Sequence, residues 1–270
     1  KGITLTSYGS GKATIKGSKL FTGWTKTIGN IWEVNTGDDK VYNSFKNKKG
    51  LINARIPDLI GTSEDDPVNY LKITSVQNVN TEFTCSELIG HQDLVGASVL
   101  ITTNPHTRSW QTIKAFNSST GKITLSGDIS SKYNLYKGRS FWIQNNFNLL
   151  TQQDEWDYDS NVNKLYVYST TKPVNITATT IDDNGIYTKY CSDMTIDNLI
   201  IRDFNQSGIW HLSSNQGRFT NLDISYTRHR GIWLTSSDNM LLENNHIFNI
   251  SHAAILLENA DNALVRLNLI

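Results

Sequence analysis

Charged residues recur with a constant 23-residue period in the last third of the sequence. Arg228, His229 and Arg230 form a cationic run, and His252 follows His229 one period later. Such a group can hold a uronate or a sulfate. It can also supply a general base beside cations that lower the pKa of an α-proton, which is the chemistry of a lyase. A solvated turn with ordinary surface charges is the alternative interpretation.

Three more residues complete the candidate catalytic set. We expect Glu258 to face outward on the same side as Trp233, as a partner carboxylate. Asp223 and His246 are again one period apart, and a stacked carboxylate and imidazole can act as orienter and base. A solvated glutamate and a structural cross-strand pair are the alternatives. The candidate catalytic residues are His229, Arg230, His252, Glu258, Asp223 and His246.

Aromatic residues follow the same spacing. Tyr187, Trp210 and Trp233 each come directly after an isoleucine, one period from the next. If the isoleucine points inward on a strand, the next residue points outward. Exposed aromatic rings suit the apolar faces of sugar rings. With Arg228, these residues are the candidate substrate-binding set. The alternative is that the inserted module or a neighbouring loop covers the rings.

Two other carboxylate pairs share the spacing. Asp238 and Asp261 are one period apart, which is compatible with the roughly 5–5.5 Å of a retaining glycosidase pair, but both lie in turn sequences where Asx-turns explain them better. Asp197 and Glu243 are two periods apart, near the upper limit of about 9.5 Å for an inverting pair.

Several function classes lack support in the sequence. No Walker loop, dinucleotide fingerprint, CxxC pair or HExxH motif is present, and these mark nucleotide, redox and zinc-protease sites. Lys+Arg and Asp+Glu both number 25, so no net field attracts nucleic acid or an anionic membrane. No apolar run is long enough to span a membrane.

Cofactor signals are also weak. The two cysteines, Cys85 and Cys191, define neither a disulfide framework nor a metal site. We therefore predict no metal site and no cofactor, since no specific motif supports Ca²⁺. The oligomeric state is left open.

The spacing itself identifies the architecture. Gly208-Ile209-Trp210 recurs as Gly231-Ile232-Trp233 and then as Ala254-Ile255-Leu256. Three further columns keep the register: Ile201, Ile224, Ile247 and Ile270; Ile196, Phe219, Leu242 and Val265; Asn198, Asn221 and Asn244. Self-similarity at a fixed period is the signature of a repeat protein.

The repeat is predicted to be a parallel β-helix. Its apolar residues form short β-branched runs separated by Asn, Asp, Ser and Gly, which is typical of strands and turns. Residues one period apart then stack roughly 4.8 Å from one another. The isoleucine columns should form the core, and His211, which shares a column with Leu234 and Leu257, should be buried. The asparagine column should hydrogen-bond along the stack at a bend.

The chain as a whole is predicted to be all-β: a right-handed parallel β-helix of 23-residue coils with an inserted small antiparallel β module. We expect opening coils in residues 1–67, the inserted module in 68–150, a returning hairpin in 151–169 and parallel coils in 170–270. Strands are expected at 31–34 and 41–45 in the opening coils, and at 71–73, 97–102, 110–115, 122–125 and 140–143 in the module.

Two short motifs point to a family. The segment Ala54-Arg55-Ile56-Pro57-Asp58 precedes the insertion, and the run 154–159 with Leu165-Tyr166-Val167-Tyr168 forms the hairpin. This order resembles secreted bacterial β-helix proteins of the pectin-lyase-like superfamily, and is most similar to glycoside hydrolases with an "ARxP" segment and a "GEWxxD…LYxY" hairpin. Asp154 stands where such hairpins usually have glycine.

The resemblance implies a function and a location. Members are extracellular or cell-surface proteins that act on polysaccharides as hydrolases or lyases. It therefore implies a glycoside hydrolase whose glycan lies along the outer wall of the coils, with a lyase acting on an anionic glycan by β-elimination, or a non-catalytic glycan-binding adhesin, as alternatives. We expect a secreted or cell-surface bacterial protein whose signal peptide and further coils lie outside this sequence, so no catalytic residue is carried over from the family.

Overall fold

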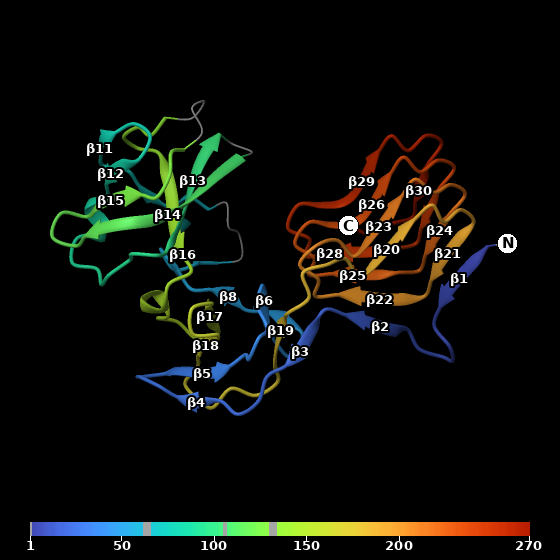
Figure 1. The fold of residues 1–270 in the computed structure, drawn as a ribbon, viewed down its shortest axis with the longest axis horizontal. Helices are drawn as coiled ribbons and strands as arrows, with labels where there is room; N and C mark the ends of the chain where they lie inside the picture. The colour runs from blue at the N-terminus through green and yellow to red at the C-terminus, as the bar shows by residue number, and fades with distance from the viewer. Residues whose placement is uncertain (1, 62–65, 105–106, 130–133) are drawn as a thin grey trace. The chain divides into compact units, whose positions relative to one another are not determined.

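The computed structural model describes residues 2–61, 66–104, 107–129 and 134–270. The chain packs into two units, each drawn in Figure 1. The solenoid unit comprises Lys1–Phe21, Asp39–Gly50 and Asn175–Ile270, and the second unit comprises Thr22–Asp38 and Leu51–Val174. Each unit is built from segments that are far apart in the sequence.

Parallel sheets form the wall of the solenoid unit (Figure 1). Sheet 1 contains β1 (Ile3–Thr6), β21 (Met194–Asp197), β24 (Arg218–Thr220), β27 (Leu241–Glu243) and β30 (Leu264–Arg266). Sheet 2 contains β2 (Ala13–Lys16), β22 (Leu199–Arg202), β25 (Asp223–Ser225) and β28 (His246–Phe248). Sheet 3 contains β20 (Ile186–Lys189), β23 (Ile209–Leu212), β26 (Arg230–Thr235) and β29 (Ala253–Glu258).

The observed register confirms the 23-residue coil. Ile201 pairs with Ile224, which pairs with Ile247, and all three side chains are fully buried. In sheet 1, Phe219 lies between Ile196 and Leu242. Fully burying one such side chain contributes about 1.5–3 kcal/mol, so these columns supply a core that continues from coil to coil.

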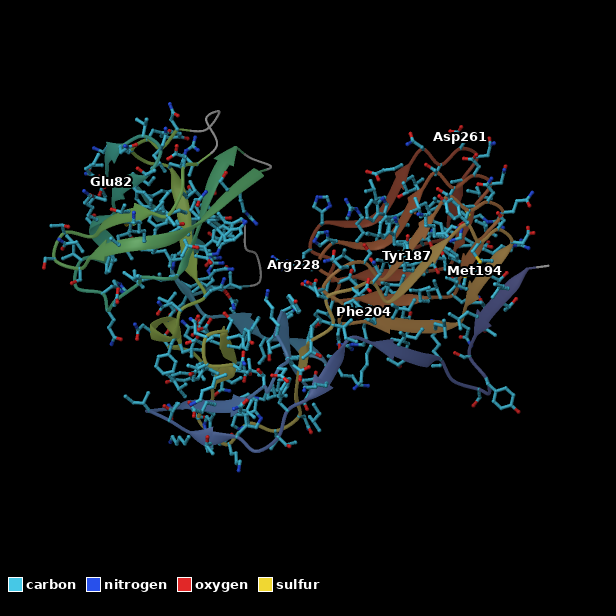
Figure 2. All side chains as sticks on the ribbon, in the orientation of Figure 1. Glu82, Tyr187, Met194, Phe204, Arg228 and Asp261 are labelled. Atoms are coloured by element: carbon cyan, nitrogen blue, oxygen red, sulfur yellow. The ribbon has the colours of Figure 1, made fainter. Side chains whose placement is uncertain are left out.

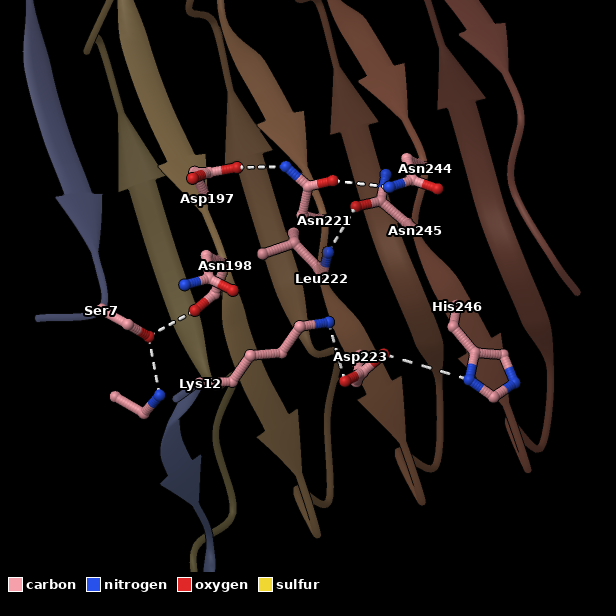
Figure 3. A network of polar contacts seen from close by, with 11 residues as sticks. Ser7, Lys12, Asp197, Asn198, Asn221, Leu222, Asp223, Asn244, Asn245 and His246 are labelled. Atoms are coloured by element: carbon pink, nitrogen blue, oxygen red, sulfur yellow. Dashed lines mark hydrogen bonds and ion pairs between the residues drawn. The ribbon is translucent and has the colours of Figure 1, made fainter. Parts of the chain in front are cut away.

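The asparagine column turns the chain between sheets 1 and 2. Asn198, Asn221 and Asn244 have φ values of 54°, 55° and 57°, a left-handed conformation that asparagine tolerates better than most residues. The Asn244 side chain donates to Asn221 Oδ1 at 2.6 Å. The Asn221 amide donates to Asp197 Oδ1 at 2.8 Å rather than to Asn198 (Figure 3).

Glycine is required where sheet 3 begins. A Cβ on Gly208 would lie 2.6 Å from Ile224 Cγ2 and 2.8 Å from the Gly231 carbonyl oxygen. These distances are shorter than van der Waals contact, so the recurring glycine reflects close packing between coils.

Antiparallel strands also belong to the solenoid unit. They are β3 (Ser18–Leu20), β19 (Ile176–Thr179), β6 (Asn43–Lys46) and β7 (Lys49–Gly50), in that order across one sheet. The first strand of the returning chain that joins the parallel stack is therefore β20, since β19 pairs antiparallel with both of its neighbours.

The second unit is antiparallel apart from one parallel pair, β17 with β8. Its larger sheet has the order β10 (Leu71–Lys72), β16 (Ser140–Gln144), β13 (Ser98–Asn104), β14 (Thr107–Asn117), β15 (Lys122–Leu125), β12 (Glu82–Thr84) and β11 (Ser75–Asn78), with β9 (Arg55–Ile56) beside β16. Its smaller sheet has the order β4 (Thr25–Lys26), β5 (Ile31–Asn35), β18 (Lys164–Tyr168), β17 (Glu155–Asp159) and β8 (Ile52–Asn53). Single 3₁₀ turns are η1 (Pro67–Asn69), η2 (Ser86–Leu88) and η3 (Phe147–Leu149).

Strands predicted for the inserted module are present as β10, β13, β14, β15 and β16, and the predicted hairpin is the antiparallel pair β17–β18. Residues 1–67 were expected to form parallel opening coils, but only β1 and β2 among their described strands join the parallel sheets of the solenoid unit. Strand β5 pairs antiparallel with β18, because that hairpin edge offers Leu165 opposite the buried Val34. Strand β6 pairs antiparallel with β19. Residues 62–65, which end this expected segment, lie outside the described residues.

We predict that Gly208→Ala lowers the free energy of unfolding by about 2 kcal/mol. The added methyl group would overpack the core, because the Gly231 carbonyl oxygen that it would meet belongs to the backbone of the next coil. Urea unfolding followed by far-ultraviolet circular dichroism measures this change. Gly11→Ala is the matched control, since a Cβ there meets no atom within 4 Å. Equal stability of the two variants would contradict the packing argument.

Candidate functional site

An aromatic column stands on the outer face of sheet 3. Tyr187, Trp210 and Trp233 are paired in register on β20, β23 and β26, and the isoleucine preceding each tryptophan is fully buried. The rings of Trp210 and Trp233 are 4.5 Å apart at an interplanar angle of 7°, whereas Tyr187 is 4.9 Å from Trp210 at 42°. The predicted stacking of outward rings is therefore present.

Stacking within the column covers most of the aromatic ring faces. Trp210 lies between Tyr187 and Trp233. One face of Trp233 is covered by Trp210, so the Arg230 guanidinium, 4.0 Å from its centroid, lies over the other. Among these three rings only Tyr187, 47% exposed at the start of the column, keeps a face open to a sugar. The tryptophans present their edges.

The indole nitrogens bind the next coil. Trp210 Nε1 donates to Thr235 Oγ1 at 3.2 Å, and Trp233 Nε1 donates to Glu258 Oε2 at 2.8 Å. Thr235 and Glu258 occupy the same register position on β26 and β29. The exposed Glu258 carboxylate is thus held beside the aromatic column, as the sequence pattern predicts.

The basic residues lie where the chain enters sheet 3, on the loops before β26 and β29 and at the first residue of β26. We call this group the basic loops: Arg228, His229, Arg230 and His252. Figure 2 shows Arg228 at one margin of the solenoid unit. Burial lowers the pKa of His229, and the charges of Arg230 and Arg228 lower it further. Its imidazole is therefore neutral over a wider pH range than usual and can accept a proton.

The basic loops are tied to an acidic residue that we did not predict. Asp182, Asn205 and Arg228 are related by the 23-residue period; Asn205 Nδ2 donates to Asp182 Oδ1 at 2.5 Å, and Arg228 donates to Asn205 Oδ1 at 3.5 Å. The hydrogen bond from Asn205 is the main reason that the pKa of Asp182 is lowered. The repeat spacing alone would have revealed this column.

Asp223 and His246 lie in sheet 2, not beside the aromatic column. Their side chains face each other, with 4.0 Å between Asp223 Oδ1 and His246 Nδ1, and the second carboxylate oxygen accepts from Lys12 Nζ at 2.8 Å (Figure 3). Arg202 does not join them, because its guanidinium donates to Asp203 and to the Lys48 carbonyl oxygen. The six candidate catalytic residues thus fall into two separate groups: His229, Arg230, His252 and Glu258 on sheet 3 or its loops, and Asp223 and His246 on sheet 2.

The other carboxylate pairs hold structural partners. Asp238 Oδ1 accepts the backbone N–H of Asp261 at 2.8 Å, a bond between turns of successive coils. Asp197 accepts from the Thr220 hydroxyl at 2.6 Å, which is the main cause of its lowered pKa. Glu243 pairs with Arg266 at 2.8 Å. Thr220 stands in register between Asp197 and Glu243, so no open space separates those two carboxylates.

Comparison with known proteins establishes the fold. A family model described as a right handed beta helix region matches residues 158–270. A solved structure titled "Glycoside hydrolase" superposes with a TM-score of 0.71 at 12% identity, covering 91% of this chain and 53% of the other. The solenoid unit has the right-handed β-helix fold. The chain spans about half the length of that glycoside hydrolase, so the match shows the fold and not the activity.

Other solved structures align less well. A tailspike of Pseudomonas phage phi297 has a TM-score of 0.27 at 9% identity, covering 73% of this chain and 33% of the other. The catalytic domain of a GH87 alpha-1,3-glucanase in complex with nigerose has a TM-score of 0.25 at 8% identity, covering 87% and 55%. Scores this low carry no argument here. No curated protein matches the sequence.

Among residues 2–61, 66–104, 107–129 and 134–270, no helix has the length and hydropathy to cross a bilayer. The same residues contain no group of three His, Cys, Asp or Glu side chains arranged to hold a metal ion. Cys85 and Cys191 are free thiols.

His211 is buried inside the β-helix, as its column predicts. It pairs in register with Leu234, is fully buried, packs edge-on against Phe219 at 5.1 Å and contacts Thr188 Oγ1 through Nδ1 at 2.5 Å. Burial lowers its pKa to about 4, so it is neutral at neutral pH.

We predict that the stability of the β-helix falls as pH falls from about 6.5 to about 4. In this window the unfolded chain binds a proton on His211 and the folded chain does not. The free energy of unfolding therefore falls by about 3 kcal/mol across the window. His211→Leu, which continues the Leu234 column, should abolish this part of the pH dependence in urea unfolding.

Thr188→Val is the matched control for that variant, because it removes the same hydrogen bond but keeps the buried imidazole. Its pH dependence should match that of the unmodified chain. A slope that survives in His211→Leu would show that another group causes it.

Proposed function

We propose that this chain is part of an extracellular polysaccharide-acting protein of the glycoside hydrolase type, with the glycan contacting the outer face of sheet 3. The observation that carries this proposal is the continuity of that face. The basic loops, the aromatic column and the Glu258 carboxylate follow one another along the same strands. Aromatic surface beside a few fixed polar groups is the usual composition of a carbohydrate site.

Hydrolysis would use the carboxylates of this face. A glycosidase needs one carboxyl group to protonate the leaving oxygen and another to act as nucleophile or to activate water. Glu258 is positioned by Trp233. Asp182, which is linked to the basic loops through Asn205, lies three coils away, roughly 14 Å along the stack, too far to form a catalytic pair with Glu258. We assign Glu258 the principal role, since it alone of the two contacts the aromatic column.

The geometry of His229 favours a second candidate, β-elimination on an anionic glycan. A lyase needs a neutral base and cations that bind the uronate carboxylate. Burial, Arg230 and Arg228 lower the pKa of His229, which keeps it deprotonated, and the two arginines supply the positive charge. Asp223 and His246, on sheet 2, would not contact a glycan bound at sheet 3.

Binding at the aromatic column is tested by Tyr187→Ala. Loss of the open ring should weaken the binding of an oligosaccharide about two- to tenfold, because an aromatic stacking contact contributes roughly 0.5–1.5 kcal/mol. Tyr8→Ala is the control, since Tyr8 is a fully exposed tyrosine of the same unit. Isothermal titration with oligosaccharides of several linkages measures the affinities, and equal effects of the two variants would refute a site at this column.

The reaction type is tested with two variants of the full-length protein. If it is a hydrolase, Glu258→Gln should lower the release of reducing ends by a factor of 100 or more, and His229→Gln should have little effect. If it is a lyase, the order reverses and the product absorbs in the ultraviolet as an unsaturated uronate.

For a lyase, Arg230→Gln should also shift the acidic limb of the pH–rate profile to higher pH, because the pKa of His229 rises when the cation is removed. Binding without turnover by the unmodified protein would leave a glycan-binding function instead.

A further inference from the structure

A polar hollow lies at the other margin of sheet 3, where each strand ends. Its volume is about 380 Å³, and it is lined by residues of three successive turns: Ser213, Asn215, Ser236, Asp238, Asn259 and Asp261. This size is within the range of small-molecule sites, roughly 300–1,000 Å³. Figure 2 places Asp261 at this margin, opposite Arg228.

The lining residues form two columns with the 23-residue spacing. Ser213, Ser236 and Asn259 share one column, each with a φ of 49°. The other column joins successive turns through backbone N–H groups: Asn215 Oδ1 accepts from the Asp238 N–H at 2.9 Å, and Asp238 Oδ1 accepts from the Asp261 N–H at 2.8 Å. The hollow is therefore held rigid by the coils themselves.

Most lining side chains keep their hydrogen-bonding capacity for a ligand. The backbone N–H groups of Ser213 and Ser236 are used between coils, with Thr235 and Glu258 as acceptors. The side chains of Ser213, Ser236, Asn259 and Asp261 have no hydrogen-bond partner among the described residues. Residues with hydroxyl, amide and carboxylate side chains thus line one hollow, with no Lys or Arg among them.

This chemistry selects the ligand class. Two aspartates and no cation disfavour an anionic ligand, whereas carboxylate and amide oxygens accept hydrogen bonds from hydroxyl groups. The lining repeats once per coil, roughly every 4.8 Å, and a polysaccharide repeats its hydroxyl groups once per sugar residue at a similar distance. A periodic ligand can therefore meet polar side chains on each of the three turns.

We propose that this hollow binds uncharged, hydroxyl-rich sugar residues of a glycan running along the β-helix axis. It adjoins the candidate site, because Ser236 follows Thr235 and Asn259 follows Glu258, the two acceptors of the indole N–H groups. The inference rests on the proposed function for the class of ligand. The hollow would be a second glycan-contacting surface besides the aromatic column, so an experiment can support one surface and exclude the other.

The two surfaces are distinguished by NMR on the isotope-labelled chain. The probes are neutral manno-, xylo-, cello- and α-1,3-gluco-oligosaccharides of two to six sugar residues, and calcium chloride alone. The side-chain amide signals of Asn215 and Asn259 report on the hollow, and the indole N–H signals of Trp210 and Trp233 report on the aromatic column. We expect at least one oligosaccharide series to shift the amide signals, with affinity that rises with length and then levels off.

A double variant tests the same contact in solution. Asn259→Gly with Asp261→Ala should weaken the binding of the responding oligosaccharide at least fivefold, as two lost hydrogen bonds imply. Glycine is chosen because position 259 has a positive φ. The matched control is Asn262→Gly, which removes an amide from the same turn, also at positive φ, but outside the hollow.

The outcomes separate the two proposals. Shifts of the indole signals with unmoved Asn amides would overturn the hollow and leave the aromatic column. Shifts of the amides alone would support the hollow and count against the column. Amide shifts with calcium alone and none with any sugar would make the hollow a cation site and overturn this proposal, as would the absence of any shift.

Discussion

Parallel hydrogen bonding between residues one 23-residue period apart is the constraint on which the rest of the solenoid unit depends. It repeats the chain about every 4.8 Å, so each residue has the equivalent residue of the next coil as its nearest neighbour. Inside, this requires columns of matched apolar size, as in Ile201, Ile224 and Ile247. On the outer surface, the same pairing limits which side chains can be accommodated, because each outward side chain contacts the side chains at the same position of the neighbouring coils.

The outer columns show how that restriction is met. Planar rings are favoured, since a repeat of this length suits ring stacking, and the rings of Trp210 and Trp233 are nearly parallel as a result. Like charges would repel at the same distance, and the columns avoid this by alternation, as in Asp182, Asn205 and Arg228. Where two aspartates do follow one another, one carboxylate is used on a backbone N–H of the next turn, which offsets the repulsion.

The sequence was informative where the repeat alone decides the outcome. The inward isoleucines, buried His211, the asparagine bend and the stacked rings all follow from register, and all are present. Partner choice within reach of a long side chain does not follow from register. The Arg202 guanidinium donates to Asp203. One carboxylate oxygen of Asp223 is paired with Lys12, a residue just before β2 and far from Asp223 in the sequence. The pairing of β5 with β18 could not be predicted either, because the sequence of a short strand does not indicate whether its partner runs parallel or antiparallel to it.

The strands of sheet 3 run from a cationic margin to an acidic one. Arg228 and Arg230 come before or at the start of β26, whereas Glu258 and Asp261 come at or after the end of β29. A glycan lying across the strands would therefore pass from the cationic margin to the acidic one, whereas one lying along the axis would stay beside one margin and meet a polar side chain on every coil. An acidic sugar is stabilised only at the basic loops, and a neutral one loses nothing at the acidic margin. Under the two proposals, charge would separate the ligands of the two margins, and the common repeat would let both surfaces contact a glycan that runs along the β-helix axis.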